Sequence, residues 1–464
     1  MKYQSPYSGA HTIYLHHKGN DVKEYDEASI ANLPPLEVDR QALAQLAEVG
    51  VIPSPASPYK NLTFLNAGDH ATFDKQTDSL DCGTHFAYGR ADSARQALDA
   101  NQFHEKLLSA TQRSVSASSD KILFLSAGKD STAIAIAMHE LGLSQNCCAI
   151  TYRAKGQDES EIARKITSDI QMPHRIIDMT SYKVSADKME AFFAAQIAPS
   201  LDLCATIYLH CGLEAFSGAE LIDGMGNDLF IGHIPAQSEL KAAHYQRMVP
   251  YSVKKQIGKL RHLHQYFMLG AKTRSEMVGL WSYLSSSPLA DALMPYDKRR
   301  QAWYELDKQN TASDYLDIRA SLRGRYIDQE KFIRKIKNAC HAYDLTLSLP
   351  WTDPELASFC HNLDDAHLFD KNALKNKLFL RDYLTSKTAI DYTKEPKYAF
   401  AYDFKAFVKD NISFVTDVIL TNDLIDKTLT KRCFDTAMRQ ENYGLIYQLF
   451  LLLGWHQFSV FVKR

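Results

Sequence analysis

The feature that most constrains the fold is a regular alternation of strand-like and helix-like segments between residues 118 and 235. Apolar runs at 121–125 ("KILFL") and 147–153 ("CCAITYR") are typical of buried strands, and segments of helical period follow them. Further strands are expected at 174–179 and at 219–223, the latter before a glycine turn. Strands that alternate with helices form a parallel sheet. The sequence therefore predicts an α/β fold with a doubly wound parallel sheet.

The segments on either side of this region differ from it. Residues 1–75 contain short alternating runs around one helical stretch, which Gly50 ends, so a small α+β unit is expected there. Residues 76–101 are polar and rich in turn formers, as in a loop or linker. Beyond about residue 235 the pattern becomes helical to the end of the chain. We find no internal repeat and no low-complexity tract.

Composition excludes several classes of protein. The chain has 464 residues, 45% hydrophobic and 23% charged, which is ordinary for a globular protein with a large core. A net charge of −2 and a pI of about 6.8 argue against general binding to nucleic acid or anionic membrane. No apolar run is long enough to span a bilayer, and the N-terminus lacks a secretory apolar region. The eight cysteines contain no CxxC pair, which favours reduced thiols and a cytoplasmic location.

A short turn follows the first predicted strand and has the character of a phosphate loop. Its sequence at 126–131 is "SAGKDS". A Walker A loop is excluded because Leu123 stands where the first glycine should be and Asp130 stands where a hydroxyl should bind Mg²⁺. A dinucleotide fingerprint is excluded because its three spaced glycines are absent.

A pyrophosphatase-type loop, Ser-Gly-Gly-x-Asp-Ser, matches the turn at five of six positions. The turn precedes a helix N-terminus, where backbone N–H groups and the helix dipole attract anions. Ser126 and Ser131 add hydroxyl donors, and Gly128 allows the backbone to approach a phosphate closely. Asp130 offers a carboxylate, which suits Mg²⁺.

The alternative interpretation is an ordinary strand–turn–helix junction with Asp130 near the N-cap. Ala127 replaces the first glycine of the loop pattern. An alanine is compatible with the loop only where the backbone does not need a positive φ.

Six segments, in order, resemble the asparagine synthetase-like (asparagine synthetase B type) branch of the PP-loop ATP pyrophosphatases. The loop "FLSAGKDSTAIA" is one, and "IDGMGNDLFIGH" is similar to the family signature Ser-Gly-Glu-Gly-x-Asp-Glu-Leu-Phe-Gly-Gly. "PWTDPELASF" and "KLFLRDYL…KEPKYAFAYDF" resemble the Pro-Phe-Leu-Asp and C-terminal blocks. The six segments span 39–74, 124–135, 158–166, 222–233, 350–359 and 377–404.

The resemblance implies a fold of the adenine nucleotide α-hydrolase-like type and a domain plan. Residues 1–100 would be a truncated remnant of an Ntn glutaminase-like domain, and 101–464 the ATP-binding synthetase domain. Within the latter, the α/β core would cover about 118–235 and the helical part about 236–464. The implied reaction begins when a substrate carboxylate attacks the α-phosphate of MgATP. Pyrophosphate leaves, and an amine then attacks the acyl-adenylate to give an amide and AMP.

The resemblance also implies roles for individual residues. Asp130 and Asp228 occupy the Mg²⁺-binding positions, and Lys397 matches the lysine that meets the phosphate as charge develops. ATP is expected to contact Leu125, Ser126, Ala127, Gly128, Lys129, Asp130, Ser131, Thr151 and Gly224.

One departure from the family concerns the nitrogen source. The glutaminase of the family needs a cysteine as its mature N-terminal residue, whereas the first cysteine here is Cys82. We therefore expect no glutaminase activity. Ammonia, an amine delivered by a partner, or an amine on the substrate itself would then supply the nitrogen.

A second departure is Met225, which stands where asparagine-forming members carry Glu and β-lactam-forming members carry Tyr. A thioether cannot accept a proton, so another base is needed or none is required. The candidates are Glu159, Tyr152, His233 and Tyr343, which the sequence does not rank. Met225 and Tyr343 are also candidates for the substrate pocket.

Together these features predict an AMP-forming carbon–nitrogen ligase of a specialised pathway for a natural product, peptide or surface polysaccharide, akin to β-lactam synthetases and lasso-peptide cyclases. Its substrates would be a small-molecule or peptide carboxylate and an amine or ammonia, with a homodimer or a pathway protein as possible partners and no nucleic acid or membrane. The alternatives are an ammonia-dependent asparagine synthase, a degenerate nucleotide-binding scaffold and an RNA-modifying PP-loop enzyme.

Overall fold

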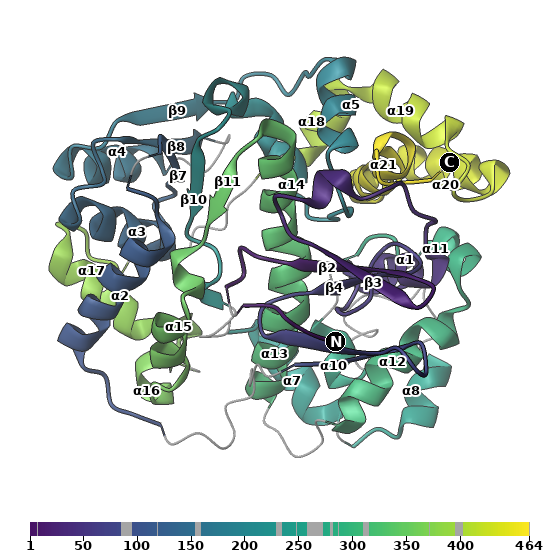
Figure 1. The fold of residues 1–464 in the computed structure, drawn as a ribbon, viewed down its shortest axis with the longest axis horizontal. Coiled ribbons are helices and arrows are strands. Elements are labelled where there is room, and N and C mark those ends of the chain that lie inside the picture. The colour runs from purple at the N-terminus through teal and green to yellow at the C-terminus, as the bar shows by residue number, and fades with distance from the viewer. Residues whose placement is uncertain are drawn as a thin grey trace.

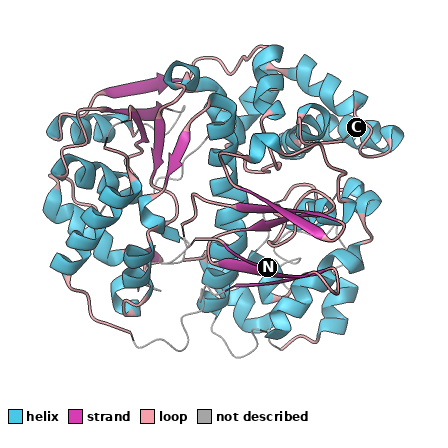
Figure 2. Ribbon diagram, in the orientation of Figure 1, coloured by secondary structure: helices cyan, strands magenta, loops and turns pink. Residues whose placement is uncertain are grey.

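The fold is known from a computed structural model (Figures 1 and 2). It describes residues 1–6, 8–84, 95–117, 119–153, 159–228, 234–246, 248–257, 272–278, 282–285, 287–309, 315–370, 372–394 and 402–463.

A parallel sheet of five strands forms the core of the predicted α/β region. Its order is β11-β10-β7-β8-β9, and every neighbouring pair is parallel. Four of these strands were predicted; the fifth, β11, was missed because it is only three residues long and lies in the helical half of the chain. The strands are β7 (Lys121–Phe124), β8 (Cys147–Arg153), β9 (His174–Asp178), β10 (Glu220–Asp223) and β11 (Thr346–Ser348).

Helices cover both faces of this sheet, which confirms the predicted doubly wound fold (Figure 1). Side chains of a strand alternate between faces, and successive residues here enter two different apolar clusters. Ile122, Ile150 and Leu221 belong to one cluster, and their neighbours Leu123, Ala149 and Ile222 belong to the other. The second cluster includes side chains from α2 (Ala100–Ser114), α3 (Lys129–Glu140) and α4 (Ser160–Asp169).

The order in which the chain visits the strands places a topological switch point between β7 and β10. From β7 the chain proceeds outward to β8 and β9, and it then returns to the other side of β7 to form β10. The loops that leave β7 and β10 therefore turn to opposite sides of the sheet. Ligands of open α/β sheets bind at such a switch point, beyond the carboxyl ends of the strands. The predicted phosphate loop follows β7, and the turn at 224–228 follows β10.

The N-terminal segment forms the expected α+β unit. It has two antiparallel sheets of three strands, ordered β1-β5-β6 and β3-β2-β4. Asp39 caps its helix, and Gly50 ends it with a φ of 80°. The elements are β1 (Lys2–Gln4), β2 (Ile13–Lys18), β3 (Asp21–Tyr25), η1 (Ile30–Asn32), α1 (Arg40–Val49), β4 (Leu62–Leu65), β5 (Asp69–Asp74) and β6 (Ser79–Thr84).

The chain beyond about residue 235 is mainly helical, as predicted, and further helices lie before it, between β9 and β10. Between β9 and β10 lie α5 (Ala186–Ala194), η2 (Ala205–His210) and η3 (Leu213–Phe216). Between β10 and β11 lie α7 (Gln237–Gln246), α8 (Tyr251–Ile257), α10 (Arg274–Val278), α11 (Pro288–Leu293), α12 (Tyr296–Gln309), α13 (Tyr315–Leu322), η4 (Arg323–Ile333) and α14 (Arg334–Tyr343). After β11 come η5 (Pro350–Thr352), α15 (Pro354–His361), α16 (Asp365–Leu368), β12 (Phe369–Asp370), β13 (Lys375–Asn376), α17 (Leu378–Lys387), α18 (Phe404–Asp410), α19 (Ile412–Thr421), α20 (Lys427–Arg439) and α21 (Tyr443–Phe458).

No helix in these described ranges is both long and apolar enough to cross a membrane.

Three consecutive helical elements, α13, η4 and α14, form one long helix that joins the N-terminal unit to the parallel sheet. Its middle part, η4, is a π-helix that continues into α14, and the whole runs between the two halves of the molecule (Figure 1). Arg334 donates to the Tyr14 hydroxyl at 3.3 Å, and its guanidinium lies 4.9 Å from the Phe64 ring centre. Arg334 also forms an ion pair with Glu330 at 3.2 Å, and the Asn66 amide donates to the Glu330 carboxylate. The N-terminal unit therefore packs onto the rest of the chain through buried polar contacts.

We expect Arg334→Ala to lower the free energy of unfolding by about 3–5 kcal/mol, because it leaves the buried Glu330 carboxylate without its cation. Urea denaturation measures the change. The control is Lys431→Ala, which removes an exposed ion pair to Asp435 and should change stability by no more than about 0.5 kcal/mol. Equal unfolding midpoints for the two variants would contradict the structural role of Arg334.

Candidate nucleotide-binding and active site

The turn at 126–131 is organised by its own hydrogen bonds. The Gly128 N–H donates to the Ser126 hydroxyl at 3.1 Å, and the Ser131 hydroxyl donates to the Ser126 carbonyl at 3.0 Å. The two hydroxyl oxygens lie 3.2 Å apart. Gly128 is the N-cap of α3, so the first N–H groups of that helix follow the turn. The loop is therefore shaped for an anion by its own backbone and hydroxyl groups.

Neighbouring elements hold the loop from both sides. Thr151, on β8, donates its hydroxyl to the Leu125 carbonyl at 2.7 Å. The Ala127 N–H donates to the carboxylate of Glu159, at the start of α4, at 3.0 Å. Ala127 is not among the residues with a positive φ, so its methyl group introduces no backbone strain. Lys129 begins α3.

The turn after β10 lies directly against the phosphate loop. A Cβ atom at Gly224 would lie 2.6 Å from the Ser131 nitrogen and 2.9 Å from the Asp130 carbonyl carbon. Real Cβ contacts to backbone are essentially never this short, so only glycine permits the approach. The structure thus brings the two predicted turns together.

A buried lysine, Lys377, stands between the two predicted magnesium ligands. Its Nζ lies 2.7 Å from Asp130 Oδ2 and 2.8 Å from Asp228 Oδ1. Burial alone would lower the pKa of Lys377, but the charges of Asp130 and Asp228 outweigh it and raise that pKa. The ammonium therefore stays charged, and its two ion pairs hold the two carboxylates close to each other.

Asp130 receives further support at both its side chain and its backbone. The Asn227 amide donates to Asp130 Oδ1 at 2.8 Å, and the Trp351 indole N–H donates to the Asp130 carbonyl at 3.1 Å. The side chains of Asp130 and Asp228 are 31% and 25% exposed, so both carboxylates remain accessible. Carboxylate oxygens in this number suit Mg²⁺, which usually takes one or two protein carboxylates and completes its shell with water and phosphate. The pair fits the predicted ion.

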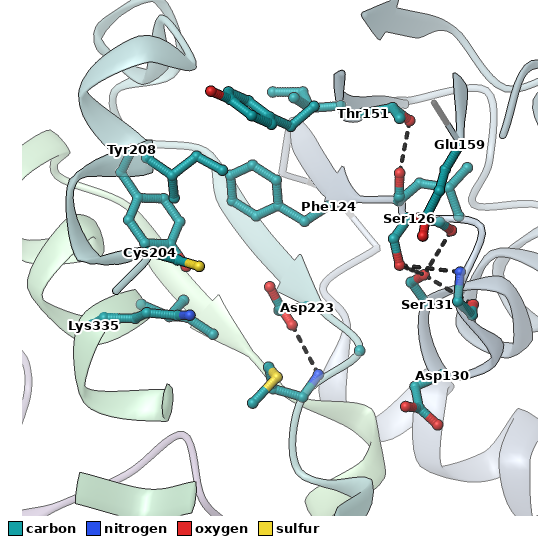
Figure 3. A pocket seen from close by; sticks show the side chains of 18 residues that line it. Phe124, Ser126, Asp130, Ser131, Thr151, Glu159, Cys204, Tyr208, Asp223 and Lys335 are labelled. Carbon is teal, nitrogen blue, oxygen red and sulfur yellow. Dashed lines mark hydrogen bonds between the residues drawn. The ribbon is translucent and has the colours of Figure 1, made fainter. Parts of the chain in front are cut away.

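A cavity of about 240 Å³ opens beside the two turns (Figure 3). Polar groups of the loop lie at one end of it, Tyr208 and Lys335 lie at the other, and Asp223 lies between them. The lining comprises Phe124, Leu125, Ser126, Gly128, Asp130, Ser131, Ile150, Thr151, Tyr152, Glu159, Cys204, Ile207, Tyr208, Asp223, Gly224, Met225, Lys335 and Ile336. The predicted ATP-contacting residues Ala127 and Lys129 are not part of the lining.

The other predicted residues take varied places. Met225, Tyr152 and Glu159 line the cavity. Tyr343 does not; it ends α14, and nearby Glu214 and Cys211 add to burial in raising its pKa. Lys397 and His233 lie outside the described residues.

Several residues around the cavity were missed by the sequence analysis. Lys377 and Trp351 lie inside two of the family-like segments, so the segments themselves could have suggested them. Asp223 precedes the second glycine turn and was counted only as the end of a strand. The sequence did not indicate that Lys335 would line the cavity, because a helical pattern does not show which lysine will face a distant site. Lys335 forms an ion pair with Asp202 at 2.9 Å.

None of the eight cysteines has the environment of an activated nucleophile. Burial raises the pKa of the Cys82 thiol to about 11 and that of the Cys147 thiol to about 12. The pKa values of the other six thiols are raised as well, in each case chiefly by burial. A catalytic thiol needs a lowered pKa.

Comparison with known proteins decides the family. A model described as asparagine synthase matches residues 102–457, which is most of the chain. The chain belongs to the asparagine synthase family. This membership makes it an ATP-using, amide-forming ligase of the PP-loop type, and it confirms the resemblance seen in the sequence.

Comparisons with solved structures and with curated proteins add little to this assignment. An NH3-dependent NAD synthetase from Campylobacter jejuni, solved in complex with a nitrate ion, is similar at 15% identity with a TM-score of 0.22. The match covers 49% of this chain and 96% of that chain. No curated protein matches the sequence.

We expect Gly224→Ala to lower the affinity for ATP at least tenfold, because the added methyl group forces the two turns apart. Isothermal titration with a non-hydrolysable ATP analogue measures the change. Gly19→Ala is the matched control: it strains a turn with a φ of 58°, but nothing lies within 4 Å of the added methyl group. Unchanged affinity in Gly224→Ala would show that nucleotide does not bind between these turns.

We expect Lys377→Ala to be destabilised without Mg²⁺ and to gain more stability from Mg²⁺ than the unaltered protein does. Its two carboxylates lose their shared cation, and a divalent ion can replace that charge. Thermal unfolding with and without MgCl₂ measures the difference. Lys375→Ala, which alters an exposed lysine two residues away, should respond to Mg²⁺ as the unaltered protein does. Equal responses in all three proteins would argue against an ion at Asp130 and Asp228.

Proposed function

We propose that this ligase activates a substrate carboxylate as an acyl-adenylate, releases pyrophosphate, and lets an amine or ammonia attack to give an amide or lactam and AMP. The observation that carries the proposal is the cavity itself. It joins the phosphate loop and Asp130, one of the two carboxylates held by Lys377, to a mixed apolar and charged part lined by Tyr208, Ile207 and Lys335. A reaction that couples ATP to a second substrate needs both compartments in one space.

In this proposal each part of the loop has a role. Ser126, Gly128 and Ser131 bind the phosphates of ATP, and Asp130 and Asp228 hold Mg²⁺. The ion would neutralise phosphate charge as pyrophosphate leaves. Lys397 would meet the same phosphate group, as the family resemblance implies.

We further propose that the nitrogen does not come from glutamine hydrolysed by this chain. That hydrolysis in the family depends on a nucleophilic cysteine, and all eight thiols here have raised pKa values. An amine tethered to the acyl group would gain effective concentration, which favours ring closure or another specialised amide in a biosynthetic pathway.

The test is carboxylate-dependent exchange of labelled pyrophosphate into ATP, screened over amino acids, dicarboxylic acids and peptide acids. We expect one class of acid to support exchange, and Asp130→Ala and Lys397→Ala each to abolish it. Lys394→Ala is the control for Lys397, since its side chain is 86% exposed and pairs only with the nearby Asp391 among the described ion pairs. Full exchange in Asp130→Ala would refute the assigned site. Exchange with aspartate, followed by ammonia-dependent asparagine formation, would narrow the substrate to aspartate.

A further inference from the structure

Between its two ends the cavity contains a carboxylate that the family comparison does not assign. Asp223 is the last residue of β10, and its side chain points into the cavity between the loop and α14 (Figure 3). One of its oxygens, Oδ1, accepts a hydrogen bond from the Met225 N–H at 2.8 Å. The next residue, Gly224, packs on the backbone of Ser131. Asp223 therefore lies where the phosphate loop meets the rest of the chamber.

Other titratable groups of the lining are poor proton acceptors. Burial raises the pKa values of Tyr152, Tyr208 and Cys204, so all three keep their protons near neutral pH. Lys335 has a raised pKa and is paired with Asp202, so it too stays protonated.

The three carboxylates of the lining differ in what already binds them. Asp130 is bound by the Lys377 ammonium and the Asn227 amide, and Glu159 accepts the Ala127 N–H on the loop side. Asp223, like Glu159, accepts one backbone N–H, and burial raises the pKa of both; Asp223 differs because it lies between the loop and the Lys335 end of the cavity.

We propose that Asp223 is the base of the amide-forming step and so replaces the side chain that Met225 lacks. This inference rests on the proposed function. In the step, the nitrogen of a neutral amine forms a bond to the acyl carbon of the adenylate. The bond from that carbon to the phosphate oxygen breaks, and AMP leaves with its electron pair. One N–H bond breaks, and its proton passes to the Asp223 carboxylate.

The electrostatic setting agrees with this role. Burial, aided by repulsion from Asp130, raises the pKa of Asp223 to about 6, although the Met225 N–H and Lys335 act against it. The groups that face Asp223 are Lys335 and Cys340 on α14, Tyr208 on η2 and Asp130 on α3. Above pH 6 the carboxylate is ionised and more basic than an ordinary aspartate, which suits a proton acceptor near neutral pH.

Asp223→Asn tests the inference, because asparagine keeps the volume and an oxygen for the Met225 N–H but cannot accept a proton. The two half-reactions are measured separately with the acid that supports pyrophosphate exchange. We expect exchange to stay within about threefold, while amide formation falls by about 10²–10⁴, the usual contribution of a general base. In the unaltered protein, amide formation should decline as the pH falls through about 6, and the variant should lack this acid limb.

Glu159→Gln is the comparison variant. Its carboxylate supports the loop, so we expect it to weaken exchange and to leave the acid limb of amide formation in place. An Asp223→Asn protein that forms amide at the normal rate, or that loses both half-reactions together, overturns the role of Asp223. Absence of exchange with every acid would instead refute the proposed function.

An infrared measurement needs no substrate. Difference spectra between the unaltered protein and Asp223→Asn, recorded from pH 4 to 8, should show a protonated carboxyl band that disappears near pH 6. A carboxylate that remains ionised down to pH 4 would overturn the inference on its own.

Discussion

The arrangement of the site depends on one charged contact, the buried ammonium of Lys377 between Asp130 and Asp228. The two carboxylates come from different turns of the sheet, and their like charges would otherwise repel each other. Lys377 lies at the start of α17, in the C-terminal half, so a distant part of the sequence completes the centre. The α/β core therefore cannot form this site without the helical part.

Much of the fold and part of the site could be predicted from the sequence because the signals are local. Strand periodicity, the loop at 126–131 and the glycine turn at 224–228 each occupy a few consecutive residues. Five of the six family-like segments also meet at the loop in the structure, through Glu159, Gly224, Trp351, Lys377 and the loop itself. Their convergence explains why the order of the segments was informative.

What could not be predicted depends on contacts between distant residues. The strand β11 has three residues and pairs with β10 only because the chain returns to the sheet edge. The π-helical stretch η4 has no signature in the residue pattern, and it buries several charged side chains, of which Glu330 contacts Asn66 of the N-terminal unit. A possible role for Asp223 likewise could not be predicted, because it depends on the cavity that this residue lines.

Gly224 has a consequence for how this enzyme can change over evolutionary time. It must remain glycine, because its Cα packs on the phosphate loop, whereas its neighbours Asp223 and Met225 both line the cavity. In the proposed function, substitution on either side would change the groups that meet the substrate, while the contact between the two turns is kept. The contact that shapes the proposed nucleotide site and the side chains that would shape the choice of product thus lie on adjacent residues.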